Sequence, residues 1–498
     1  MAKKIAVPLT PQVKSHGNIP PLDKLPAMHV LVLIAKGYLP GKVPGHALRE
    51  AVLHRETKSS TNRPGTEPVA ASLGSRLIVW AEWDGDGSVF EQQTAIRKAV
   101  ELLAKESPSD VAILLHCPDV ALAACGEQAV YVVAVNGRYR LGKISRAGMV
   151  DGGALKAIHL FGAGKSFSTV RCLAIAEGNL LARSLTLRPP NDLTPKRYRR
   201  DIAALAKLHG WKHREYDFDA LRRMAAGAFC AVAQGSPQRD AAIIHLSYRP
   251  THAKGAARAV SLVGKGICMD TGGHGLKSAK HMYGMHEDMN GSAVVLGILT
   301  AATAMRWPVA IDAWLAIAQN HIGPEAYQPG DVVTALDGTT IEVVHTDAEG
   351  RMALADTLTL AARAKPALIV DFATLTGAMV FSLGTRMCGV FANRLALADA
   401  AVASGRACGE RVCAFPLDAD YDESLVSKVA DVKQCLIEGE ADAIYGARLL
   451  SRFVEGTPWI HVDLSAYRHD GGLGAVSGAV NGFGVAWGVA LLEKQTGP

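Results

Sequence analysis

The sequence lacks the features that mark several protein classes. Its nine cysteines are scattered, odd in number and without a CxxC pair, which argues against a disulfide framework or a thiolate zinc site. No segment provides about 18 uncharged apolar residues in a row, and the charged start of the chain has no sustained apolar core of the secretory-signal kind. We therefore expect a cytoplasmic protein without membrane contact, whose cysteines are mostly small buried residues.

A strong excess of one charge is also missing. The net charge is +6 over 498 residues, which does not by itself indicate a nucleic-acid partner. The densest basic run, "KRYRR" at 196–200, follows Thr194 and Pro195, a typical helix N-cap and first-turn pair. We interpret this run as a solvated helix face, and contact of the run with DNA is the alternative.

The composition that is present, 49% hydrophobic and 20% charged residues, is that of a globular protein long enough for two domains. In the first part of the chain, strand-like runs at 28–36, 76–83 and 110–117 surround a helical pattern at 92–106. A helical pattern at 169–187 then leads into "RPPNDLTP", whose prolines are typical of a hinge. We predict an N-terminal domain at 1–170, a linker helix and hinge at 171–195, and a second domain at 196–498.

The second region repeats the alternation of strands and helices. Apolar runs at 257–270, 308–319, 367–378 and 459–464 are typical of buried strands, and 291–307 has a helical pattern. This order predicts a mainly parallel central sheet flanked by helices, with a site at the carboxyl ends of its strands. The predicted fold is thus α/β in two domains, a smaller N-terminal one and a larger C-terminal one.

Charged residues gather near these predicted strand ends. They are two lysines and four carboxylates: Lys265, Asp270, Lys277, Asp288, Asp347 and Glu349. In "HTDAEGR", the alternate positions of Asp347, Glu349 and Arg351 predict one side of a short extended piece. Four carboxylates in one cavity would repel one another unless cations lay among them, and two divalent ions about 3.5 Å apart would neutralise them. The alternative is a set of surface acids beside turns.

The spacing of these residues resembles the leucyl aminopeptidase family, also called cytosol aminopeptidases or peptidase family M17. The family motif NTDAEGR reads "HTDAEGR" here, and the pattern from Lys265 through Asp270 and Lys277 to Asp288 matches as well. Further similar segments are "LVGKGI", "DTGG", "GPEAYQPGDVV", "DFATLTGA", "TPWIHVDL" and the "PPNDLTP" hinge. The resemblance covers nearly all of the second region, which it identifies as a catalytic domain, and the first region only in general character.

The resemblance implies a ligand set for two divalent ions, manganese or zinc, with magnesium as a third option. One ion would take Asp270, Asp347 and Glu349, and the tighter one would take Lys265, Asp270, Asp288 and Glu349. Because a lysine ligates only through its neutral amine, we expect a strongly lowered pKa for a metal-bound Lys265.

The resemblance also implies roles for residues that are not ligands. Lys277 would stabilise the oxyanion, and Arg351 would anchor a bicarbonate that acts as general base. Backbone at Ala348, Gly350 and Leu375 would complete the anion pocket. The substrate-binding residues implied are Lys277, Met282, His345, Thr374, Gly377 and Ser465.

Several positions depart from the family pattern. His345 replaces an asparagine, Asn290 replaces a glycine, and the stretch 434–450 lacks the usual glycine-rich hairpin. The first two departures bear on substrate preference. Histidines 274, 281, 286 and 345 are the candidates for extra zinc ligands, although the predicted set is sufficient without them.

The expected function is a metal-dependent leucyl aminopeptidase that hydrolyses N-terminal residues from peptides with a free N-terminus. The resemblance implies a homohexamer. A narrow dipeptidase, for example acting on cysteinylglycine, is one alternative, which His345 keeps open. A DNA-binding or architectural protein on the same scaffold is the other, motivated by the basic run at 196–200.

Overall fold

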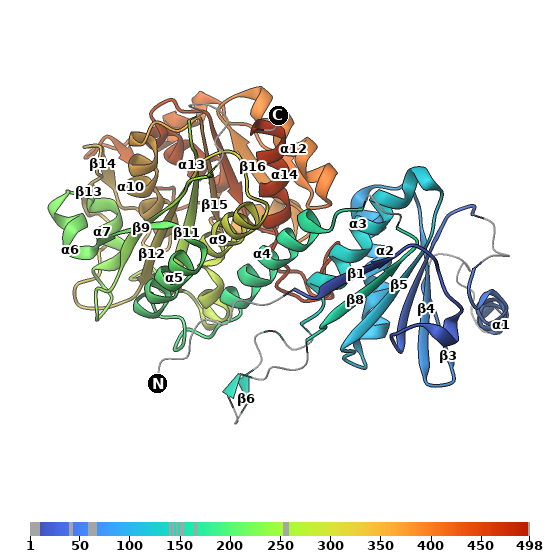
Figure 1. Ribbon diagram of the computed structural model, residues 1–498. Helices are drawn as coiled ribbons and strands as arrows, with labels where there is room; N and C mark the ends of the chain where they lie inside the picture. Colours follow the sequence, from blue (N-terminus) through green and yellow to red (C-terminus); the bar gives the residue numbers. More distant parts are fainter. Residues whose placement is uncertain are drawn as a thin grey trace.

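Two large β-sheets with their covering helices dominate the described part of the chain (Figure 1), and a three-stranded and a two-stranded sheet accompany them. The computed structural model describes residues 10–38, 43–57, 67–138, 141, 144–145, 148–149, 154–163, 167–251 and 258–496. The predicted strand at 257–270 therefore begins one residue outside the described part, and the start of the chain at 1–9 also lies outside it. The N-terminal sheet and the C-terminal sheet lie side by side, with helix α4 (Val170–Thr186) between them.

The N-terminal sheet has six strands in the order β1-β8-β5-β2-β4-β3. Their bounds are β1 Gln12–His16, β2 His29–Ala35, β3 Val69–Leu73, β4 Arg76–Trp83, β5 Asp110–His116 and β8 Ala157–Phe161. Among the six described strands of this sheet, β3 alone pairs antiparallel to its neighbour. The helices of this region are α1 His46–Thr57, α2 Val89–Ala104 and α3 Asp119–Val135. Strands β2, β4 and β5 and helix α2 confirm the predicted elements. The apolar side chains of the strands divide between two hydrophobic cores, and α2 contributes to one of them.

The C-terminal sheet has eight strands in the order β17-β16-β19-β15-β11-β12-β10-β9. Their bounds are β9 Lys212–Asp217, β10 Ala242–Tyr248, β11 Val260–Asp270, β12 Ile311–Asn320, β15 Leu368–Ala373, β16 Cys388–Ala392, β17 Val412–Ala414 and β19 Trp459–Asp463. The four central strands β12, β11, β15 and β19 run parallel, and antiparallel strands flank them. The carboxyl ends of the central strands therefore share one edge, as predicted.

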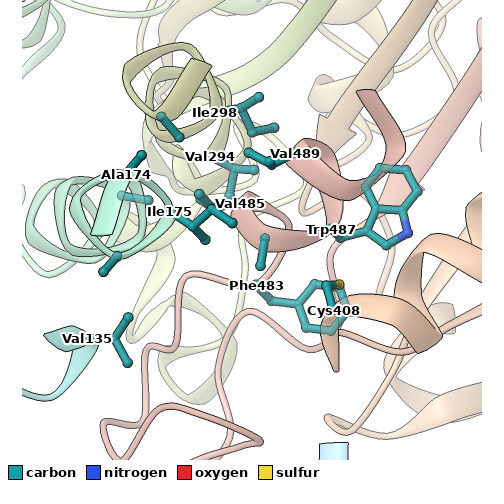
Figure 2. Close-up of a cluster of buried hydrophobic side chains, with 14 of the residues drawn as sticks. Val135, Ala174, Ile175, Val294, Ile298, Cys408, Phe483, Val485, Trp487 and Val489 are labelled. Atoms are coloured by element: carbon teal, nitrogen blue, oxygen red, sulfur yellow. The ribbon is translucent and has the colours of Figure 1, made fainter. Parts of the chain in front are cut away.

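Helices cover both faces of this sheet. Helices α9 (Asn290–Ala304), α12 (Leu395–Cys408) and α14 (Val485–Thr496) contribute to one hydrophobic core together with α4. Helices α7 (Gly227–Ala233), α10 (Glu349–Arg363) and α13 (Asp442–Ser451) contribute to a second core. The first core continues through α4 and α3 into the N-terminal sheet, and Figure 2 shows part of it, where side chains of α4, α9 and α14 meet.

The predicted hinge is tightly held. Arg188 lies between Asp192 and Asp201, at 2.7 and 2.6 Å from their carboxylate oxygens. The Thr194 hydroxyl then caps helix α5 (Pro195–His209) by accepting from the Arg197 amide, and Gly210 ends the helix with φ of 72°. Within the described part of the chain, no helix combines the length and the apolar character needed to cross a membrane. Eight of the nine cysteines are buried, as predicted.

Candidate metal centre

The predicted ligands lie at the carboxyl edge of the central strands. Lys265 and Asp270 belong to β11, and a register shift before Asp270 marks the end of its regular pairing with β12. Asp288 ends the short helix Met285–Glu287 just before α9. Asp347 lies in the loop before α10, and Glu349 is the first residue of that helix. Three segments of the chain thus bring these side chains to one place.

The prediction of a short extended piece at Asp347–Arg351 is wrong. The chain from Glu349 onward is helix α10, and only the preceding loop is non-helical. Strand-like alternation over five residues is too short to decide between a strand and a helix start, and the apolar run that follows extends the helix back to Glu349. The two acids still converge, because Asp347 reaches the centre from the loop and Glu349 from the first turn of the helix.

Close packing at glycines allows this convergence. A Cβ at Gly350 would lie 2.7 Å from Lys265 Cε, so the Lys265 side chain passes directly against the first turn of α10. A Cβ at Gly291 would lie 2.1 Å from the Phe372 carbonyl oxygen, so the first turn of α9 lies against the end of β15. Side chains at these two positions would push Glu349 and Asp288 away from β11.

The lysines lie among the carboxylates. Lys265 Nζ is 2.8 Å from both Asp288 Oδ2 and Glu349 Oε1. Lys277 Nζ is 2.9 Å from Asp270 Oδ2 and 2.5 Å from Asp347 Oδ1. One oxygen each of Asp270, Asp347 and Glu349 lies within 4.8 Å of the other two, a spacing that could hold a metal ion. The histidines considered as extra ligands are not part of this described group.

The donor set fits divalent cations. Glu349 Oε2 is buried and accepts no hydrogen bond within the described residues, and Asp288 Oδ2 and Asp347 Oδ1 face only lysine ammonium groups without good hydrogen-bond geometry. Burial raises the pKa of Asp288, Asp347 and Glu349, and the neighbouring carboxylates add to this rise. A cation among these oxygens would supply the missing contacts and relieve the repulsion between the carboxylates. Oxygen-rich donors suit manganese, magnesium or zinc.

The two lysines respond to the same charges. Burial lowers the pKa of the Lys265 amine, but Asp288, Glu349 and Asp270 outweigh it and raise the pKa above its ordinary value. For Lys277 burial again opposes Asp270, Glu349 and Asp347, and the result is also a raised pKa. The raised pKa keeps Lys277 protonated beside these carboxylates, and the lowered pKa expected of a metal-bound Lys265 stays a prediction.

A second layer of residues orients the acids, and the sequence patterns indicated neither of its two buried members, Asn320 and Tyr327. Asn320 Nδ2 donates to Asp270 Oδ1 at 2.8 Å and to the Thr346 carbonyl at 3.0 Å. The Tyr327 hydroxyl donates to the same carbonyl at 2.8 Å. The Thr374 hydroxyl donates to Asp288 Oδ1 at 2.6 Å. Asn320 had one available signal, since it ends the apolar run of β12 at the carboxyl edge of the sheet.

Arg351 faces protein groups. Its side chain is 2% exposed, with Nη2 2.9 Å from Asp442 Oδ1 and Nη1 3.2 Å from the Gln434 carbonyl oxygen. Gln434 in turn holds the loop before α10, because its Oε1 accepts from the amides of Val344 and His345 and its Nε2 donates to the Ala348 carbonyl. Both partners of Arg351 come from the 434–450 stretch that departs from the family pattern.

The predicted substrate residues differ in how closely they join the centre. Thr374 contacts Asp288 directly, and His345 Nδ1 accepts from the Asp347 amide at 3.1 Å. Met282 is half-buried at the end of the short helix Ala279–Met282, and Gly377 is exposed at the start of α11 (Gly377–Leu383). Within the described residues, neither makes a hydrogen bond to the acids. The Ser465 hydroxyl is buried and donates to the Met387 carbonyl.

Asn290, which was expected to bear on substrate preference, makes its side-chain hydrogen bond to another helix. Its Nδ2 donates to the Thr186 hydroxyl at 3.0 Å, which joins the start of α9 to the end of α4. This departure from the family pattern thus acts on packing between helices.

The chain matches the model of the cytosol aminopeptidase family, catalytic domain, over residues 180–489. It is similar to a probable cytosol aminopeptidase of Rhodopseudomonas palustris (strain BisB5), 38% identical over 64% of this chain and 62% of the relative. It is also similar to one of Methylorubrum extorquens, 39% identical over 64% of this chain and 63% of the relative. The match thus spans less than two thirds of these relatives' lengths.

Two solved structures share the fold over almost the whole chain. The bottromycin maturation enzyme BotP in complex with Mn is 30% identical, with a TM-score of 0.80 over 94% of this chain and 99% of that one. The leucyl aminopeptidase from Leishmania major in complex with actinonin has a TM-score of 0.80 over 98% of this chain and 95% of that one. At 24% identity, the second likeness shows the fold alone.

Proposed function

Because the chain belongs to the cytosol aminopeptidase family, we propose that it is a metal-dependent leucyl aminopeptidase that hydrolyses N-terminal residues from peptides. The observation that carries this proposal is the convergence of Lys265, Asp270, Asp288, Asp347 and Glu349 at the carboxyl edge of the central strands. All five predicted ligands and Lys277 are present.

Two divalent ions would be held by these residues. Asp270, Asp347 and Glu349 would hold one, and Lys265, Asp270, Asp288 and Glu349 would hold the other, so that Asp270 and Glu349 are shared. When bound, such ions polarise a peptide carbonyl and lower the pKa of a water molecule. We propose manganese or zinc, with magnesium as a third option, and the manganese complex of a similar structure supports the first.

The chain's own groups would position the substrate and the charge. Lys277 keeps its ammonium beside Asp270 and Asp347, and we propose that this charge stabilises the oxyanion that develops on the scissile carbonyl. The carboxylates would favour a positively charged or metal-bound α-amino group at the peptide's N-terminus. This requirement for a free amine would make the enzyme an exopeptidase.

The second expected cofactor, bicarbonate, does not fit this arrangement. Arg351, its predicted anchor, is engaged by Asp442 and Gln434. Two of its three predicted backbone donors are engaged as well: the Leu375 amide donates to Asp463 Oδ1 at 3.1 Å, and the Ala348 amide donates to the His345 carbonyl at 3.1 Å. We therefore assign no step of the reaction to bicarbonate.

The substrate pocket and the assembly remain proposals. The pocket for the first residues of the peptide would be lined by Lys277, Met282, His345, Thr374, Gly377 and Ser465. Several large apolar side chains are strongly exposed in the single chain, among them Tyr283, Phe381, Leu395 and Ile437. Their exposure supports a homohexamer or a peptide-binding rim, since such side chains gain by being covered. A cytoplasmic location is part of the same proposal.

The structure adds no support for either alternative function. The basic run at 196–200 is partly neutralised, because Arg197 pairs with Asp201 and Arg199 with Glu215, and Tyr198 is buried. This pairing reduces the charge available to DNA phosphates. The dipeptidase alternative depends on His345, which is exposed and packs against Gly275. Dipeptidase activity would appear as a restricted product pattern in the experiment below.

The proposal is tested by mass spectrometry of a mixed peptide pool in free and N-acetylated forms. The pool is incubated with the manganese-loaded protein and with its Lys277→Ala variant. We expect removal of single residues from the free-amine peptides alone, and only by the unmodified protein. Cleavage of acetylated peptides, or no cleavage with manganese, zinc or magnesium, would overturn the proposal.

A further inference from the structure

Arg351 carries a buried positive charge next to the metal centre. It lies in the first turns of α10, two residues after Glu349, and a buried guanidinium is costly unless an anion is paired with it. The anion in this structure is Asp442, whose Oδ1 is 2.9 Å from Arg351 Nη2. The two residues lie 91 positions apart in the chain.

The geometry of α13 aims Asp442 at this guanidinium. Asp442 is the first residue of α13, and its side chain is 26% exposed. One turn further along, a Cβ at Gly446 would lie 3.2 Å from Leu375 Cδ2 and 3.5 Å from Arg351 Nη2. Gly446 therefore lets Arg351 and Leu375 approach the helix closely. An acid at a helix start is common for dipole reasons alone, but this one also faces a buried cation.

Most of the groups of Arg351 that could bind an external anion already have partners within the chain. The two terminal nitrogens of Arg351 are engaged by Asp442 and by the Gln434 carbonyl, and Arg351 Nε alone is buried without a partner among the described residues. A free anion would have to displace a carboxylate that is tethered to the same chain and therefore present at high effective concentration.

We propose that Asp442 is a built-in anion that takes the place of a free bicarbonate on Arg351. It is a positioning residue: it neutralises Arg351 and holds the first turns of α10, and hence Glu349, against β11. Peptide hydrolysis would then be independent of bicarbonate. This inference rests on the proposed function for its kinetic part, whereas its anion-binding part stands without it.

The test compares the metal-loaded protein with Asp442→Ala and Asp442→Asn in carbonate-free buffer, before and after addition of bicarbonate or formate. We expect bicarbonate to change the unmodified protein's kcat/KM by less than about two-fold, and both variants to lose about ten-fold or more and to recover with either anion. Asp442→Asn keeps the side-chain volume if the alanine variant does not fold. Glu440→Ala, an exposed acid two residues away, serves as the matched control and should match the unmodified protein.

A binding measurement separates the two proposals. Calorimetric titration with bicarbonate should show binding to Asp442→Ala and none to the unmodified protein, whether or not any peptide is cleaved. Bicarbonate binding to the unmodified protein, or a fully active Asp442→Ala variant that binds no anion, would overturn the role of Asp442. Absence of cleavage by every protein, with the expected binding pattern, would overturn only the aminopeptidase proposal.

Discussion

At the scale of single residues, the position of each proposed ligand depends on the groups that hydrogen-bond to it. Asn320 is fully buried and links Asp270 to the Thr346 carbonyl, so it fixes the carboxylate that both proposed ions share. Outer partners of this kind typically contribute 10- to 100-fold to metal affinity or activity, by rough estimate. Sequence patterns do not show such partners, because any polar residue at a strand end could fill the role.

We therefore predict that Asn320→Ala weakens manganese retention by about 10- to 100-fold. Equilibrium dialysis followed by elemental analysis would measure the bound metal. Gln319→Ala is the matched control, since adjacent residues of β12 point to opposite faces of the sheet. Equal metal retention by the two variants would contradict the role given to Asn320.

A buried acid outside the centre makes stability depend on pH. Asp356 on α10 is fully buried, and its oxygens accept from the Phe229 and Leu336 amides at 2.8 and 2.7 Å. Burial, only partly offset by these hydrogen bonds, raises the pKa of Asp356 from 3.8 to about 7. Because the folded pKa lies above the unfolded value, the folded state holds the proton more tightly. Its contribution to stability is full below about pH 4 and is lost as the pH rises through about 7.

The predicted consequence concerns Asp356→Asn, which cannot ionise. The unmodified protein's free energy of unfolding, relative to this variant, should fall between pH 4 and 7, by up to about 4 kcal/mol. Urea unfolding at several pH values measures the difference. A difference that stayed constant over this range would show that the carboxylate is ionised at every pH tested.

At the scale of elements, the crossing of α4 and α9 sets the position of Asp288. A Cβ at Gly178 would lie 2.3 Å from the Gly297 carbonyl oxygen, and a Cβ at Gly297 would lie 2.6 Å from that of Gly178. The two helices therefore touch backbone to backbone, in the cluster that Figure 2 shows around Ile175, Val294 and Val485. Asp288 stands two residues before α9, so any displacement of this helix moves a proposed ligand.

Gly178→Ala should destabilise the protein by about 1 to 3 kcal/mol, because the added methyl forces the helices apart. The same replacement at Gly17, where an added Cβ meets no atom within 4 Å, is the control and should leave the stability nearly unchanged. Thermal unfolding would report both effects, and manganese affinity would show whether the strain reaches Asp288. An unchanged unfolding temperature for Gly178→Ala would rule out the close crossing.

At the scale of the whole molecule, the metal centre joins parts that are far apart in the chain. The proposed ligands come from the central sheet and from both of its faces. Asp270 lies on strand β11, Asp288 lies just before α9, which belongs to one core, and Glu349 lies on α10, which belongs to the other. Cations shared by these carboxylates would therefore tie the two cores together. Their removal would leave mutually repelling buried charges at the meeting point.

Chelation with EDTA should accordingly lower the unfolding temperature, and manganese should restore it. Metal at 100 times its dissociation constant would stabilise the folded state by about 2.7 kcal/mol. Differential scanning calorimetry measures the change. Asp270→Asn, which lacks the shared carboxylate, should respond far less to either addition. An unmodified protein indifferent to EDTA would argue against tightly held ions.

The sequence by itself determined the local parts of this protein. Apolar runs predicted β2, β4, β5 and β11, and Thr194 with Pro195 predicted the start of α5, because these signals lie within a few residues of one another. The family resemblance carried by the spacing from Lys265 to Asp288 likewise implied the candidate ligands before any geometry was known.

Only the tertiary structure decided how the parts meet. It placed Glu349 on a helix where the sequence predicted an extended piece, since five residues carry too little periodicity to distinguish the two. It gave Asp270 its partner Asn320, 50 positions away, and Arg351 its partner Asp442, 91 positions away. Such pairings depend on which strands are neighbours and how closely helices approach, and these are set by packing of the whole core and not by any local pattern.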